Sequence, residues 1–299
     1  MSRIFIFTLL LLSLISTSCK SVQPTNGSNP AFSYPETIIP KDITKLWVAE
    51  GDSTKQIVII FLQGGPKDEL DFEKNKKSHW RHLPNYKNYY SIHLHQANTF
   101  NPKMFTYDCN FTMKMARKEV NNTSEMLSKA IKHFKEKGKT VWVMGHSYGA
   151  YIIPHYLASN TSLADKYVII SGRINDPKNV IKAHKKGFNG IYDDGITFVS
   201  DEKDNDFKDY NIWAIKYYTA KQRLKAAIGE ISYIKALKSI DLSNVTYIYS
   251  PKDKRVGGLT KQEIQFLQIK NAKVFKTHHE HGYTIRGLLD EIKKGNIKL

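Results

Sequence analysis

The chain has 299 residues, of which 41% are hydrophobic and 12% aromatic, so it can form a folded core and is not a disordered or low-complexity protein. Its formal net charge is +17, but its 45 basic residues comprise 38 Lys and 7 Arg, scattered along the chain. Nucleic-acid recognition favours clustered Arg side chains that grip phosphate, so we expect a solvated, Lys-rich surface and no nucleic-acid partner.

Residues 1–18 have the features of a secretory signal peptide. Arg3 precedes an apolar run from Ile4 to Ile15, which is shorter than the roughly 20 residues that a membrane-spanning helix needs. Small residues then precede Cys19, an arrangement that resembles the lipobox of bacterial lipoproteins, in which this cysteine is acylated after cleavage. We therefore expect a lipid anchor on Cys19 and a place in the bacterial cell envelope, on a membrane facing the periplasm or the cell surface. Ser16 stands where lipoboxes usually have Leu, so ordinary cleavage after Ser18 is the alternative.

The chain has only two cysteines, Cys19 and Cys109. If Cys19 is lipidated no disulfide can form, and Cys109 is expected to be a small buried residue rather than a catalytic one. Residues 19–40 are rich in Ser, Asn, Thr and Pro and lack periodicity, which indicates a tether between the anchor and the folded domain.

From residue 41 the strand-like and helix-like patterns alternate, which is typical of crossover units around a mostly parallel sheet. Strands are predicted at 44–50, 55–63, 88–96, 139–145, 166–172, 244–253 and 272–278, and helices at 112–137, from Ser147 onward, at 260–271 and at 283–294. The first two strands are expected to pair as a hairpin that turns at Gly51 and Asp52. Thr260 and Glu263 predict a capping box at the start of a helix.

The sheet pattern stops after Gly172 and resumes at 244, so residues 41–172 and 244–299 form the predicted core. The intervening residues 173–243 contain a polar, acidic loop and a helical segment with an aromatic run of Tyr210, Trp213, Tyr217 and Tyr218. An insertion of this length is typical of a cap or lid. We expect its aromatic run to be mainly the apolar face of a cap helix.

Residues 145–149 read GHSYG and match the G-x-S-x-G pattern of a nucleophile elbow. An apolar strand ends at Gly145 and a helix follows Ser147, which is the context that the motif requires. Small flanking residues are needed because the serine occupies a tight, strained turn. Ser147 is therefore the candidate nucleophile, and neighbouring His146 is expected to pack beside it or to support the catalytic residues from behind.

A glycine-rich loop, QGGPK at 63–67, follows an earlier predicted strand. An acyl-transfer serine needs two backbone N–H donors for the developing oxyanion, one from the residue after the serine and one from such a loop. We assign these donors to Tyr148 and Gly65. A plain Gly-Gly-Pro turn is the alternative.

A base and its orienting carboxylate are expected in the order Ser, Asp, His. Asp253 follows one predicted strand, and a cluster of His278, His279 and His281 follows the next. Because the carboxyl ends of parallel strands meet at one edge of a sheet, these groups can approach Ser147. Spacing does not select one histidine, and three histidines could instead bind a metal, although no cluster of carboxylates or cysteines accompanies them.

The set QGGP, GHSYG, DKRV and HGY, in this order, resembles the α/β-hydrolase superfamily over residues 44–299. The resemblance implies an α/β-hydrolase fold with a mostly parallel sheet, flanking helices and a helical cap insertion at 173–243. It also implies Asp253 as the acid and His281 as the base. The GGP tract is similar to the HGGPG tract of proline iminopeptidase-like enzymes, but Gln63 replaces the histidine and Lys67 the last glycine.

These features predict an enzyme, an extracytoplasmic serine hydrolase that cleaves a small acyl ester or a peptide without cofactor or metal. A carboxylic ester is favoured. The alternatives are a proline iminopeptidase-like aminopeptidase and a non-catalytic, ligand-binding surface lipoprotein. Arg173, which follows a strand at the same edge, is a candidate contact for an anionic part of the substrate.

Overall fold

A computed structural model of the protein describes residues 36–78, 80–105, 111–202 and 212–298. The predicted signal peptide, the predicted anchor residue Cys19 and the thiol Cys109 lie outside the described residues. Of the predicted tether, only residues 36–40 are described, and here Thr37 is buried and donates a hydrogen bond to Glu119 Oε1 (2.7 Å). Within the described ranges, no helix combines the length and the apolar composition needed to cross a membrane.

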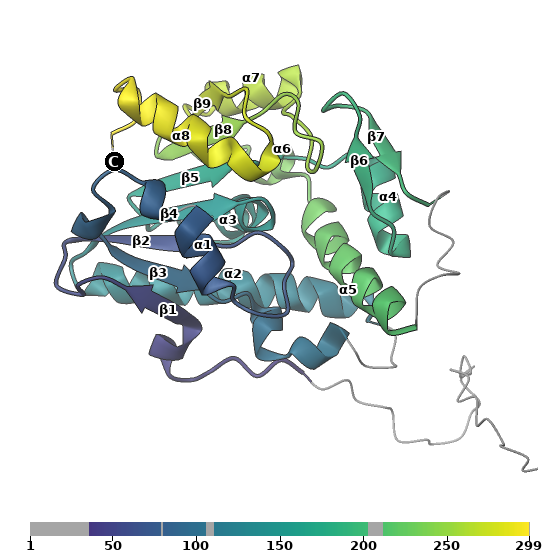
Figure 1. Ribbon diagram of the computed structural model, residues 1–299, viewed down its shortest axis with the longest axis horizontal. Coiled ribbons are helices and arrows are strands. Elements are labelled where there is room, and N and C mark those ends of the chain that lie inside the picture. The colour runs from purple at the N-terminus through teal and green to yellow at the C-terminus, as the bar shows by residue number, and fades with distance from the viewer. Residues whose placement is uncertain (1–35, 79, 106–110, 203–211, 299) are drawn as a thin grey trace, which may run out of the picture. The chain divides into compact units, whose positions relative to one another are not determined.

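A seven-stranded sheet with the order β1-β3-β2-β4-β5-β8-β9 forms the centre of the molecule (Figure 1). All neighbouring strands run parallel except the edge strand β1, which is antiparallel to β3. This arrangement confirms the predicted mostly parallel sheet. The strands are β1 (Trp47–Glu50), β2 (Ile57–Leu62), β3 (Tyr90–Leu94), β4 (Thr140–His146), β5 (Lys166–Ile170), β8 (Val245–Tyr249) and β9 (Lys273–Lys276).

The predicted hairpin between the first two strands is wrong. β1 pairs with β3, with Trp47 opposite Leu94, and β3 separates β1 from β2. The reason lies in the side chains. β2 is apolar along nearly its whole length and takes an interior position between two parallel strands, whereas β1 exposes Val48 and fits the edge of the sheet.

Helices cover both faces of the sheet, with α8 and α1 on the near side in Figure 1 and α2 and α3 on the far side. The helices are α1 (Phe72–Ser78), α2 (Met113–Glu136), α3 (Tyr148–Ser159), α4 (Lys178–Lys186), α5 (Ile212–Gly229), α6 (Tyr233–Ala236), α7 (Lys261–Ile269) and α8 (Thr284–Lys293). The predicted capping box of α7 is confirmed, because Thr260 Oγ1 accepts from the Glu263 N–H (3.2 Å) and Glu263 Oε2 accepts from the Thr260 N–H (2.7 Å).

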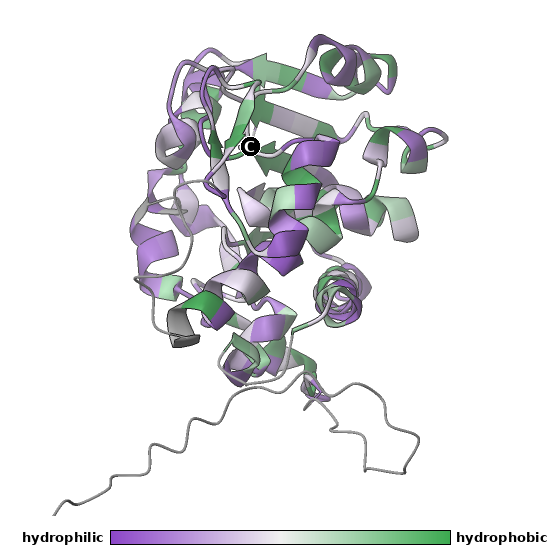
Figure 2. Ribbon diagram, turned by 90° about the vertical axis from the view of Figure 1, so that its right-hand side faces the viewer, coloured by the Kyte–Doolittle hydropathy of each residue, from purple (hydrophilic) through white to green (hydrophobic). Residues whose placement is uncertain are grey.

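The core follows the alternation of side chains along the strands. Phe61 and Met144 project from the sheet toward Ile285 and Leu288 of α8, and all four are nearly inaccessible to solvent. The strands are correspondingly mostly green in the hydropathy colouring of Figure 2, while the helices carry purple, hydrophilic stretches. Burial of this apolar surface is the main force that holds the helices on the sheet.

Most of the elements between β5 and β8 lie beside the sheet, at the right of Figure 1, and α6 lies nearer the middle of the picture. These elements are α4, a two-stranded hairpin of β6 (Gly190–Tyr192) and β7 (Phe198–Ser200), α5 and α6. α5 packs against α4 and against α2 of the core. A helical segment was predicted here, but the hairpin was not. Tyr210 and the side chain of Trp213 lie outside the described residues.

Candidate active site

Ser147 occupies a sharp turn between β4 and α3. Its backbone angles are φ 55° and ψ −120°, a region that non-glycine residues rarely adopt. Strain of this kind persists only where the surrounding structure enforces it, and it is concentrated at functional sites. Here the Ser147 N–H is held by the carbonyl of Ile170 at the end of β5 (3.0 Å).

The two flanking glycines are required by close backbone contacts. A Cβ atom at Gly145 would lie 2.4 Å from the carbonyl oxygen of Gly149, and one at Gly149 would lie 2.2 Å from the carbonyl oxygen of Leu62. No side chain larger than hydrogen fits at either position. The G-x-S-x-G spacing therefore follows from the packing of α3 against β2 and the turn itself.

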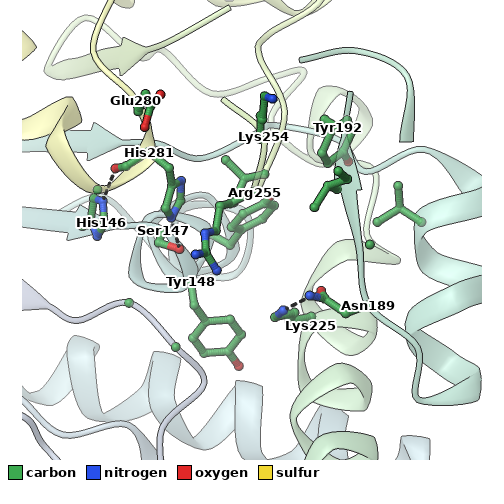
Figure 3. A pocket seen from close by; sticks show the side chains of 18 of the residues that line it. His146, Ser147, Tyr148, Asn189, Tyr192, Lys225, Lys254, Arg255, Glu280 and His281 are labelled. Carbon is green, nitrogen blue, oxygen red and sulfur yellow. Dashed lines mark hydrogen bonds between the residues drawn. The ribbon is translucent and has the colours of Figure 1, made fainter. Parts of the chain in front are cut away.

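The structure places Ser147, His281 and Asp253 in one hydrogen-bonded chain. His281 Nε2 lies 3.0 Å from Ser147 Oγ, as Figure 3 shows, and His281 Nδ1 lies 2.8 Å from Asp253 Oδ2. A carboxylate can only accept, so the Nδ1 atom must carry the proton and the Nε2 lone pair faces the serine hydroxyl. This is the tautomer in which the imidazole can take a proton from Ser147.

Asp253 is fixed by its second oxygen. Oδ1 accepts hydrogen bonds from the N–H groups of Arg255 (2.9 Å) and Val256 (3.1 Å), and the residue is 1% exposed. These two donors leave only Oδ2 for the histidine. The short turn after β8 thus fixes the orientation of the carboxylate as well as its position.

His281 is also positioned through its backbone. His146 Nε2 donates to the carbonyl oxygen of His281 (3.1 Å), and the rings of the two histidines lie 5.1 Å apart (Figure 3). Thr284 Oγ1 lies within hydrogen-bond distance of this carbonyl (3.3 Å) and of the carbonyl of Glu280 (3.0 Å), which share its single proton. The sequence predicted His146 as a packing or supporting residue beside the serine, and in the structure its hydrogen bond holds the segment that carries His281.

The predicted oxyanion loop passes directly over the serine. A Cβ atom at Gly64 would lie 3.3 Å from Ser147 Cβ, and Gly65 adopts φ 150°. Tyr148 is the first residue of α3, so its N–H has no carbonyl partner within the helix. Gly65 and Tyr148 both line the cavity in front of Ser147. The loop and the helix start therefore border the same space in front of Ser147.

Gln96 holds this loop from the neighbouring strand. Its Nε2 donates to the carbonyls of Gln63 (3.0 Å) and Gly64 (3.2 Å), and its Oε1 accepts from the Lys67 N–H (3.0 Å). Gln96 is 3% exposed. Sequence reasoning missed this residue, whose one signal was a polar side chain just beyond the end of the buried strand β3.

Gln63 explains the departure from the HGGPG pattern. Its Nε2 donates to the Glu69 carbonyl (2.8 Å), and its Oε1 accepts from the Asp71 N–H (3.0 Å) and from Asn75 Nδ2 (3.0 Å). The amide thus ties the start of the loop to its end and to α1. An imidazole has one donor and one acceptor at most and could not make all three contacts.

The predicted substrate contact of Arg173 is wrong. The side chain is 3% exposed, pairs with Glu263 Oε2 (3.1 Å) and does not line the cavity. Arg173 follows β5 as expected, but its guanidinium is paired with the carboxylate of Glu263, which also caps α7.

Of the predicted aromatic run, Tyr217 packs against Phe105 (5.4 Å between ring centroids) rather than lining the cavity.

The other two histidines of the cluster lie away from Ser147. His279 Nε2 contacts Asp290 Oδ2 (3.0 Å), and the ring of His278 stacks on that of His279 (4.2 Å). In the part of the chain that the structure describes, no group of three or more His, Cys, Asp or Glu residues is arranged to hold a metal ion.

A cavity of about 920 Å³ lies in front of Ser147, between the edge of the sheet and the inserted elements. α4, the β6–β7 hairpin and α5 contribute Val180, His184, Tyr192, Phe198 and Lys225 to its wall. Burial lowers the pKa of His184 to about 4, so this ring is neutral at pH 7. The cavity has room for a small organic molecule with its carbonyl at Ser147.

No family model matches the chain, and no curated protein matches its sequence. Solved structures match its fold. A lipase-esterase related protein from Clostridium acetobutylicum superposes with a TM-score of 0.50 over 83% of this chain and 98% of its own, at 14% identity. A hydrolase from Oleispira antarctica superposes with a TM-score of 0.50 over 85% of this chain and 97% of its own, at 12% identity. At these identities the likeness concerns the fold alone, and the chain has the α/β-hydrolase fold that its motifs implied.

Proposed function

We propose that the protein is a serine hydrolase that cleaves a carbonyl ester or amide through an acyl-enzyme, with a carboxylic ester favoured. The observation that carries this proposal is the hydrogen-bonded chain from Asp253 through His281 to Ser147, whose last two members line a cavity. A non-catalytic binding protein would not need a strained serine held in line with a base and its carboxylate.

The geometry supports a standard order of proton transfers. His281 Nε2 takes the proton of Ser147 Oγ as the oxygen attacks the carbonyl carbon, and Asp253 stabilises the resulting imidazolium. The Tyr148 and Gly65 N–H groups stabilise the oxyanion. The imidazolium then gives its proton to the leaving alcohol or amine, and water, activated by the same histidine, releases the acid. Losing one oxyanion donor in such sites typically slows turnover about 100- to 1000-fold.

Charge favours an ester hydrolase over an aminopeptidase. The cavity is lined by six Lys or Arg side chains but only three Asp or Glu. An aminopeptidase must hold the ammonium group of its substrate, which a surplus of positive charge opposes. We therefore place the iminopeptidase-like activity second, supported only by the Gly-Gly-Pro tract.

We also propose that residues 173–243 act as a cap over the site and that the protein is anchored by lipid at Cys19, outside the cytoplasm. Incorporation of radiolabelled palmitate tests the anchor. Labelling of the wild-type protein that disappears in Cys19→Ser supports it, and labelling that persists in this variant contradicts it.

Labelling with a fluorophosphonate probe tests the serine-hydrolase assignment. Wild type is expected to label, Ser147→Ala is expected not to, and Ser159→Ala, which changes an exposed serine of the same helix, should label as wild type does. Equal labelling of Ser147→Ala, or none of the wild type, would show that the assignment is wrong. Comparing p-nitrophenyl esters with amino-acid p-nitroanilides then ranks the two activities, and faster turnover of the anilides would reverse our order.

A further inference from the structure

We propose that Lys225 and Arg255 form a binding site for a carboxylate of the substrate, so that the protein acts on esters or amides that carry a negative charge away from the scissile carbonyl. This inference rests on the proposed function of Ser147 and specifies its substrate class. Both side chains line the cavity that contains Ser147 and His281.

Lys225 brings a cation into the wall of the cavity with only a neutral partner. It lies on α5, and its Nζ donates a hydrogen bond to Asn189 Oδ1 (3.2 Å), as Figure 3 shows. Among the residues that the structure describes, no carboxylate lies within ion-pair distance of it. A lysine at the surface of a protein is ordinarily solvated or paired with a carboxylate. Lys225 is instead partly buried, and it lines the cavity.

Arg255 supplies a second cation, from the turn after β8. It extends from the turn that carries Asp253 into the cavity, beside Ser147 and His281 in Figure 3. Its backbone N–H donates to Asp253 Oδ1. Its guanidinium makes no ion pair with any carboxylate among the residues that the structure describes. A guanidinium offers a planar fork of donors that matches a carboxylate. The site would thus be joined to the catalytic turn itself.

The charges around Lys225 are unbalanced. Its pKa is lowered to about 8, first by burial and then by the positive charges of Lys221 and Arg255, while Asp176 and Asp201 act more weakly in the opposite direction. His184 of α4, which also faces Lys225, is neutral at pH 7. A bound anion would relieve this repulsion. The two aspartates make a single negative charge a better fit than a dianion, so a carboxylate is preferred over a phosphate.

Other cations of the cavity wall are less suited to this role. Lys67 already pairs with Asp71 Oδ2 (3.0 Å). Lys252 and Lys254 are exposed, as Arg255 also is, but in Figure 3 the Arg255 guanidinium lies beside Ser147 whereas Lys254 points away from it. Lys225 and Arg255 are therefore the pair to test.

Matched esters that differ only in charge test the proposal. One set places the charge in the acyl part: p-nitrophenyl hydrogen glutarate and adipate against the same compounds capped as methyl esters. A second set places it in the leaving group: 4-acetoxybenzoate against its methyl ester. In at least one set we expect wild type to prefer the charged ester about tenfold or more in kcat/KM, after subtraction of spontaneous hydrolysis.

Substitution should remove this preference selectively. Lys225→Met and Arg255→Gln are expected to lower kcat/KM for the charged ester about 10- to 100-fold, and for its neutral partner less than about threefold. Lys182→Met, which removes an exposed lysine of α4 that does not line the cavity, should leave both unchanged. Because Lys225 is held charged against burial and like charges, Lys225→Met should not lower the melting temperature.

Three outcomes would overturn the proposal: equal turnover of charged and neutral esters in both sets, losses that are the same for both esters, or a loss of folding in Lys225→Met that accounts for the loss of activity. Calorimetric titration of Ser147→Ala with the same esters separates the subsite from the chemistry. If wild type hydrolyses none of the esters but Ser147→Ala binds the charged ones more tightly, the proposed function fails and the subsite stands. If it binds both alike, the subsite fails.

Discussion

Asp253→Asn is the sharpest test of the proposed mechanism, because the structure fixes which way the new amide must turn. The Arg255 and Val256 N–H groups both donate to Oδ1. An asparagine keeps these two bonds only if its carbonyl oxygen takes the place of Oδ1. Its NH₂ group then faces His281 Nδ1, which must accept, and the ring proton moves to Nε2. In this tautomer the histidine donates to Ser147 and cannot accept its proton.

The size of the effect follows from the cost of the opposite orientation. Turning the amide would direct its NH₂ group at two backbone donors, and leaving a buried donor without an acceptor costs about 1–3 kcal/mol, so two of them cost about 2–6 kcal/mol. Such a penalty corresponds to a factor of about 30 to 25,000 in rate. Loss of the carboxylate charge that stabilises the imidazolium adds to it, so we expect kcat to fall about 1,000- to 10,000-fold, as is typical of triads with this substitution.

The assay is steady-state hydrolysis of a p-nitrophenyl ester by Asp253→Asn and by a matched control. Asp290→Asn changes the carboxylate of the neighbouring pair, His279 Nε2 to Asp290 Oδ2 (3.0 Å), and should keep kcat within about twofold of wild type because no step uses it. Circular dichroism should be unchanged for both variants. A kcat for Asp253→Asn within tenfold of wild type would refute the proposed role of this carboxylate.

Three further results are expected. Gly149→Ala would place a methyl group against the Leu62 carbonyl, so urea denaturation should show that the free energy of unfolding falls by at least about 1–3 kcal/mol. In the control Gly282→Ala the new methyl group has nothing within 4 Å, and the free energy of unfolding should stay within about 0.5 kcal/mol of wild type. Equal losses in the two variants would contradict the steric explanation. Gln96→Leu removes three hydrogen bonds from the proposed oxyanion loop. It should lower kcat about tenfold or more with little change in KM, so a change confined to KM would count against a positioning role. The pKa of Lys225 is lowered to about 8, so its positive charge is lost as pH rises through that value. Over the same pH range the ratio of kcat/KM for charged to neutral esters should fall in wild type but not in Lys225→Met. A ratio that does not change with pH in wild type would exclude Lys225 as the anion contact.

Local patterns in the sequence were sufficient for the elements that each depend on near neighbours. The long helix from Met113, the apolar strand that ends at the elbow and the capping box of Thr260 are set by side-chain periodicity and by hydrogen bonds over three residues. The G-x-S-x-G spacing also marked the strained turn at Ser147, because glycine is what a tight strand-to-helix turn requires there.

Strand partners and long-range contacts required the tertiary structure. A sheet edge is chosen by competition among all strands, so the sequence could suggest a hairpin of β1 with β2 although β3 lies between them. Likewise, Arg173 follows its strand as predicted, but only the packed structure shows that it forms an ion pair with Glu263. The roles of Gln96 and Lys225 depend on neighbours 29 to 36 residues away in the chain, which no local pattern encodes.

The sequence by itself therefore determined the type of fold and marked Ser147, because strand and helix periodicity and the G-x-S-x-G motif are local properties, while the resemblance of DKRV and HGY to hydrolase motifs pointed to Asp253 and His281. Only the tertiary structure brought these three side chains to hydrogen-bonding distance, fixed the carboxylate by two backbone donors and gathered Lys225 and Arg255 around one cavity. Distances and charge balance in a site depend on how distant segments pack, and that packing is decided by the burial of the whole apolar core.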